Sequence, residues 1–199
     1  MPKKPNSPNL SNQPNSSWWT KPGYKNLLVY KLATIIYDLT VKFCSINLKP
    51  TSRTTDQMVQ AARSGKQNIV EGSLEKSLKG YIKLTSVARA SFGELLEDYK
   101  DFLRQHNLSV WPKDDPRVLK IRHWRIDSPN TADLPNLANW LSSPEPFANL
   151  LITLISLDTY LLDQLLRKLE EKFVNEGGYT ENLFQRRLDK KYNHRVDSV

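Results

Sequence analysis

The stretch from Thr54 to Ser73, TTDQMVQAARSGKQNIVEGS, most constrains what this chain can fold into, because its side chains sort by size and polarity at helical spacing. One face of such a helix is apolar and built largely from small residues: Met58, Ala61, Ala62, Gly65, Ile69 and Gly72. Gly65 costs roughly 1 kcal/mol of helix propensity relative to alanine, which close approach of a second helix would offset. The stretch therefore predicts a closely packed core helix in an α-helical bundle.

The opposite face of this helix is polar and rich in cations. It carries Arg53, Asp56, Gln60, Arg63 and Gln67, with Lys66 at the border between the two faces. A solvated surface and a surface that binds an acidic partner both fit this pattern. The sequence leaves these two interpretations open.

Apolar residues recur at three- and four-residue spacing in three further long segments, and each predicts a helix. Together with the helix described first and a short helix after Gly177 and Gly178, they give five expected helices, over residues 24–46, 52–72, 77–106, 146–175 and 179–192. Thr54 or Thr55 is the expected N-cap of the second helix. The apolar arcs of the first and fourth helices are wider than one packed face needs, which indicates an additional partner surface.

Residues 109–146 interrupt this pattern with six prolines and are expected to form an insertion between the third and fourth helices. Asp115 and Pro116 fit the N-cap and first turn of a short helix reaching Arg125, and residues 135–141 fit another. The segment RVLKIRHWR is basic and aromatic, a composition that suits nucleic acid. The insertion's three tryptophans are expected to anchor it to the helices, namely Trp111, Trp124 and Trp140.

The 199 residues suit one sizeable domain: a disordered arm at 1–23, a bundle at 24–176 and a basic C-terminal suffix at 177–199. We find no apolar run of about 18 residues and no signal peptide, so we expect a cytoplasmic protein without membrane contact. Cys44 is the only cysteine and is expected to pack as a small hydrophobe. His106, His123 and His194 lack metal-ligand or nucleophile spacing. The sequence therefore predicts no enzyme activity, no cofactor and no metal.

The chain resembles the four-helix-bundle proteins first noted in intervening sequences of bacterial large-subunit ribosomal RNA genes. The resemblance is strongest over QMVQAARSGKQNIVEGS, which is similar to the family pattern Q-x-x-R-A-A-x-S-x-x-x-N-I-x-E-G. Gln60 stands where the family usually has arginine, and Lys66 and Gln67 replace a commoner Ile-Pro pair, which indicates a divergent branch. The insertion and the ending NEGGYTENLFQRR resemble a subgroup with a C-terminal suffix. The resemblance covers residues 24–195.

The resemblance implies an antiparallel up-down four-helix bundle that assembles as a ring, typically a homopentamer, without known enzymatic activity. A related family member is the accessory variability protein of diversity-generating retroelements, which binds a reverse transcriptase and RNA or DNA through a basic surface. Within the motif, Asn68 is expected to make a structural hydrogen bond.

The formal net charge is +8, and the positive excess falls in residues 1–80 and 177–199. Together with the resemblance, this distribution predicts a non-catalytic, oligomeric nucleic-acid-binding adaptor. The expected phosphate-binding residues are Arg53, Arg63, Lys66, Lys76, Lys79, Arg186, Arg187, Lys190 and Lys191. The alternative is a protein-interaction scaffold, an accessory subunit of a reverse transcriptase in a diversity-generating retroelement.

Overall fold

The computed structural model describes residues 23–196, without the side chains of residue 133 and of residues 192–196, so the expected disordered arm at 1–23 lies outside the described residues apart from Gly23. Helices and connecting loops make up this part of the chain, without a β-strand, which confirms the all-α prediction. The elements are η3 (Tyr24–Asn26), α1 (Leu28–Asn47), α2 (Arg53–Leu74), α3 (Leu78–Gln105), α4 (Pro116–Arg122), η4 (Thr131–Asp133), α5 (Leu137–Trp140), α6 (Pro144–Glu176) and α7 (Tyr179–Val196).

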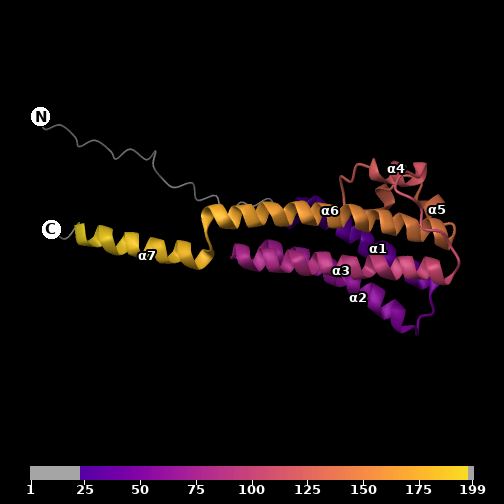
Figure 1. Cartoon of the computed structure of the whole chain (residues 1–199), viewed down its shortest axis with the longest axis horizontal. Coiled ribbons are helices and arrows are strands. Elements are labelled where there is room, and N and C mark those ends of the chain that lie inside the picture. Colours follow the sequence, from indigo (N-terminus) through magenta and orange to yellow (C-terminus); the bar gives the residue numbers. More distant parts are fainter. Residues whose placement is uncertain (1–22, 197–199) are drawn as a thin grey trace, which may run out of the picture.

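Four long helices share one hydrophobic core. The helices α1 and α3 each pack against both α2 and α6, and the short helices α4 and α5 lie on α6 (Figure 1). The last helix, α7, continues past the end of α6, so it extends the molecule along its long axis (Figure 1). The insertion and α7 are therefore associated with opposite ends of α6.

The small apolar face of α2 packs against α3, as the sequence predicts. All six of its residues, Met58 to Gly72, are buried. At Gly65 the ring of Phe92 occupies the space of the absent side chain, since a Cβ there would lie 2.6 Å from Phe92 Cζ. Beside this contact the hydroxyls of Ser64 and Ser91 lie 3.0 Å apart, and Asn68 Nδ2 donates to the Ser64 carbonyl oxygen at 2.9 Å. The predictions of close packing and of a structural role for Asn68 are confirmed.

Several helix ends differ from the sequence prediction. Ser52, not Thr54 or Thr55, is the N-cap of α2, because its Oγ accepts from the Thr54 backbone N–H at 3.3 Å. The cap of α4 is Asp115, as expected, but this helix ends at Arg122 rather than Arg125. After Arg122 the Trp124 backbone N–H donates to the Ile121 carbonyl oxygen at 3.1 Å, and this three-residue spacing ends the α-helical hydrogen-bond pattern.

The core contains polar groups with contrasting environments. Tyr99 and Thr40 are both fully buried, and the Tyr99 hydroxyl donates to Thr40 Oγ1 at 3.0 Å. Asp158, in the middle of α6, is also fully buried, but neither carboxyl oxygen has a hydrogen-bond partner among the described residues. Burial therefore raises the pKa of Asp158 well above its usual range. The neutral, protonated acid is the form that this core accommodates.

The segment Pro144–Lys191, which contains α6 and most of α7, is long and apolar enough to cross a membrane, and core helices share these properties. Here eleven residues of α6 are buried, and the helix packs against α1, α3 and α4. Its wide apolar arc is thus only partly covered within the chain, since Leu157, Leu161 and Leu165 are half-buried.

We expect Gly65→Ala to lower the free energy of unfolding by about 1–3 kcal/mol, because the added Cβ meets the buried Phe92 ring. This loss should appear although alanine favours helix by roughly 1 kcal/mol. The matched control is Gly93→Ala in α3, where nothing lies within 4 Å of the added Cβ. The control should gain stability in urea denaturation, and a similar gain for both variants would contradict the close contact.

We expect Asp158 to make stability fall as pH rises. In the unfolded state the Asp158 carboxyl group loses its proton above a pKa of about 3.9, whereas in the folded state it keeps this proton to a higher pH. The contribution of Asp158 to the free energy of unfolding is therefore most favourable below about pH 3.9. It is lost progressively as the pH rises from there toward the raised pKa of the folded state. Relative to Asp158→Asn, the wild-type free energy of unfolding should fall by up to about 1.4 kcal/mol per pH unit across this window. Urea denaturation across the pH range measures this difference, and parallel curves would show that Asp158 does not titrate.

Candidate nucleic-acid interface

The nine predicted phosphate-binding residues fall in three parts of the structure. Arg53, Arg63 and Lys66 lie on α2, Lys76 and Lys79 flank the start of α3, and four lie on α7: Arg186, Arg187, Lys190 and Lys191. Eight of the nine are exposed, and Lys66 is half-buried. The structure therefore does not gather them into one continuous surface.

The cations of α2 have neighbours that compete with a phosphate. Arg53 lines a polar groove of about 810 Å³ between α2 and α3, together with the carboxylates of Asp56, Glu94 and Asp98. Lys66 Nζ lies 4.3 Å from the centre of the Tyr37 ring on α1. A phosphate at Arg53 would meet three carboxylates, so the geometry does not favour this position.

The acidic half of α3 accounts for the character of this groove. Burial raises the pKa of Asp98 from its ordinary value, and the neighbouring charges of Asp101 and Glu94 raise it further. The groove therefore disfavours additional negative charge.

The cations of α7 have a different setting. Because Arg186 and Lys190, and likewise Arg187 and Lys191, are separated by four residues, the quartet covers one side of the helix. None of the four has an ion pair within the part of the chain that the structure describes. Figure 1 places α7 at the end of the molecule where α3 begins, which is the region of Lys76 and Lys79. Six of the predicted cations are thus associated with one end.

The turn that leads into α7 is well defined. Gly177 has φ 73°, a left-handed value that glycine adopts without strain. Glu181 then accepts the Gly178 backbone N–H at 2.7 Å. Four large hydrophobic side chains of α7 are also exposed, namely Tyr179, Leu183, Phe184 and Leu188.

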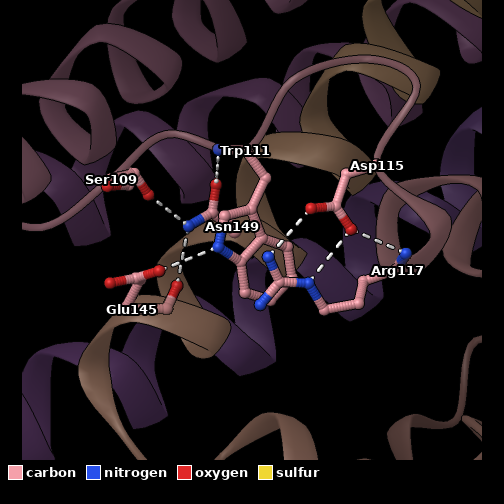
Figure 2. Close-up of polar contacts among 6 residues, drawn as sticks. All are labelled: Ser109, Trp111, Asp115, Arg117, Glu145 and Asn149. Carbon is pink, nitrogen blue, oxygen red and sulfur yellow. Dashed lines mark hydrogen bonds and ion pairs between the residues drawn. The ribbon is translucent and has the colours of Figure 1, made fainter.

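A second polar site lies in the insertion, where the sequence predicted anchoring tryptophans and, in RVLKIRHWR, a composition that suits nucleic acid. Trp111 and Trp140 are buried and Trp124 is half-buried, with ring centres 6.1 Å apart for Trp111 and Trp140 and 6.0 Å apart for Trp124 and Trp140. Trp111 donates its backbone N–H to Asn149 Oδ1 at 2.8 Å and its indole N–H to Glu145 Oε1 at 2.9 Å, as Figure 2 shows. The anchoring prediction is confirmed, and α6 supplies the partners.

The Arg117 guanidinium lies over the Trp111 ring, with its central carbon 3.6 Å from the ring centre. Asp115 holds it there through bonds of 3.0 Å from Nε and 2.8 Å from a terminal nitrogen (Figure 2). These bonds keep the pKa of Asp115 below its usual range. The spacing Asp115-x-Arg117 at a helix start is the local signal of this pair, but its position on Trp111 is tertiary.

A small pocket of about 210 Å³ opens beside this stack. Its walls include Trp111, Arg117 and Trp140, and its polar rim consists of Lys120, Asn136 and Asn139. All three rim residues are exposed.

Chemistry-bearing groups elsewhere are sparse. Among residues 23–196, apart from the side chains that are not described, we find no cluster of three His, Cys, Asp or Glu residues that could hold a metal ion. Cys44 is buried, as predicted, and burial followed by the charge of Asp98 raises its pKa to about 11. Such a thiol is a poor nucleophile at neutral pH.

Comparison of the chain with protein-family models, with curated proteins and with solved structures found no match. The resemblance to the ribosomal intervening-sequence proteins therefore remains a prediction that rests on the motif around Gly65.

Proposed function

We propose that this chain is a non-catalytic nucleic-acid-binding adaptor whose main phosphate-binding surface is α7. The observation that carries the proposal is the quartet of exposed cations on one side of α7, none of them paired with a carboxylate among the described residues. Unpaired cations on an exposed helix lose no internal contact when they bind phosphate and release counterions from it.

Lys76 and Lys79 extend this surface at the start of α3. Both are exposed and lie within two residues of the start of α3, and Figure 1 shows this start at the end of the molecule from which α7 projects. Arg53 and Lys66 contribute less in this proposal, because carboxylates surround the first and Tyr37 engages the second. Arg63 is exposed on α2 and adds to the general positive field.

We further propose that α1, α2, α3 and α6 form an antiparallel up-down four-helix bundle. The contacts of α1 and α3 with both α2 and α6 support this arrangement. Such a bundle agrees with the resemblance to the ribosomal intervening-sequence family. In keeping with this resemblance, we propose that the chain assembles into a homo-oligomeric ring, typically a pentamer. A ring would repeat each α7 and raise the effective concentration of cations around a nucleic acid.

The alternative is an accessory subunit of a reverse transcriptase in a diversity-generating retroelement. The exposed Leu183, Phe184 and Leu188 favour a protein partner, because phosphates do not require apolar neighbours. A reverse-transcriptase gene beside this one would favour the alternative, whereas a position within a ribosomal RNA operon would favour the adaptor.

Binding of the purified chain to RNA and to DNA, measured over a range of salt concentrations, tests the proposal. We expect Lys190→Gln with Lys191→Gln to lower the slope of log affinity against log salt by about 1.4–1.8, because two phosphate contacts are lost. The matched control is Lys42→Gln with Lys49→Gln, which removes the same charge from exposed positions outside the proposed surface.

Equal slopes for the two double variants would contradict the role of α7. If the chain binds neither RNA nor DNA alone, but a complex with a reverse transcriptase does so, the alternative is correct. Solution mass with and without RNA reports the oligomeric state independently.

A further inference from the structure

The pocket beside Trp111 has a composition that anchoring alone does not require. It combines two tryptophan rings, a guanidinium, a second cation and two carboxamides in about 210 Å³. This volume is below the roughly 300–1,000 Å³ of pockets for drug-sized ligands, and is more suited to a single small ring system.

Trp111 and Arg117, which line the pocket, are held in fixed positions. Asn149 and Glu145 fix Trp111 through its backbone and indole N–H groups, and Asp115 fixes Arg117 over its ring. The Arg117 side chain is still 52% exposed, so one side of this stack remains open. Planar guanidinium and aromatic groups held in this way are surfaces on which an unpaired base stacks.

The rim supplies hydrogen-bonding groups with unused capacity. The side chains of Asn136 and Asn139 make no hydrogen bond within the described part of the chain, although each carries donors and an acceptor. Asn136 has φ 56°, a left-handed value at the very start of α5. Carboxamides match the mixed donor and acceptor edges of a base.

Lys120 completes the pocket with a positive charge. Its side chain is exposed and has no ion pair among the described residues, whereas the charge of Arg117 is already opposed by Asp115. A phosphate next to a stacked base would therefore be attracted to Lys120 rather than to Arg117. The pocket thus combines a stacking surface, carboxamides that can pair with the edge of a base, and a cation for the phosphate.

We propose that this pocket binds one unstacked base of a single-stranded nucleic acid, with the adjoining phosphate at Lys120. The inference rests on the proposed function and deepens it, since it names the form of nucleic acid that this chain selects. A duplex keeps its bases stacked and paired, so it cannot fill the pocket without paying an unpairing cost. The pocket therefore favours single strands over duplexes, while α7 binds the phosphates of both.

The test uses the full chain with labelled short single strands and duplexes of equal length. The pocket variant is Lys120→Gln with Asn139→Ala, which leaves Arg117, Trp111 and their hydrogen bonds in place. The control is Lys42→Gln with Asn175→Ala, which removes one exposed cation and one exposed amide outside the pocket. Relative to this control, the pocket variant should lose about tenfold in affinity for the single strand and less than about twofold for the duplex.

Equal affinities of the two variants for the single strand would overturn the inference while leaving the role of α7 intact. Tryptophan fluorescence with adenosine monophosphate or uridine monophosphate gives a separate measurement that does not involve α7. Quenching of the wild type that disappears in the pocket variant supports the pocket, even if strands bind too weakly to support the proposed function. Quenching that is equal in both variants, or absent from the wild type, overturns it.

Discussion

The contact of the Phe92 ring with Gly65 fixes the arrangement on which the other features depend. Any side chain at Gly65 would meet the ring within 3 Å, so α2 and α3 can approach this closely only where Gly65 faces Phe92. This requirement fixes the register of the two helices. In this register the hydroxyl groups of Ser64 and Ser91 also lie within hydrogen-bond distance of each other. With the register fixed, the polar face of α2 is directed away from the core and next to the acidic half of α3, so Arg53 lies among carboxylates.

Asp158 gives the core a different kind of constraint. A buried carboxyl group without a hydrogen-bond partner destabilises the fold when it ionises. The buried Tyr99 hydroxyl differs, because it donates a hydrogen bond to Thr40 Oγ1. The cost of burying an ionised group is avoided while Asp158 stays protonated. Its presence means that the stability of this helix packing is linked to proton uptake.

The small apolar face of α2 and the long helices were predictable, because apolar residues recur at helical spacing within each single segment. Met58 to Gly72 needed only the helical repeat, and Asp115 with Pro116 needed only the capping rule. Placement of Trp111 on Asn149 joins residues 38 positions apart, and no local rule encodes it. For the same reason, charge alone could not separate Lys66, which Tyr37 engages, from the unpaired cations of α7.

The two proposed nucleic-acid contacts are separated by the length of α6. The pocket lies next to Pro146 at its beginning, and α7 follows its end, so a helix of 33 residues spans about 50 Å between them. A short strand held in the pocket of one copy would not reach the α7 of the same copy. Binding at both contacts then requires a long strand or the α7 of a second copy of the chain. In the second case, assembly would combine the preference of the pocket for single strands with the positive charge of α7.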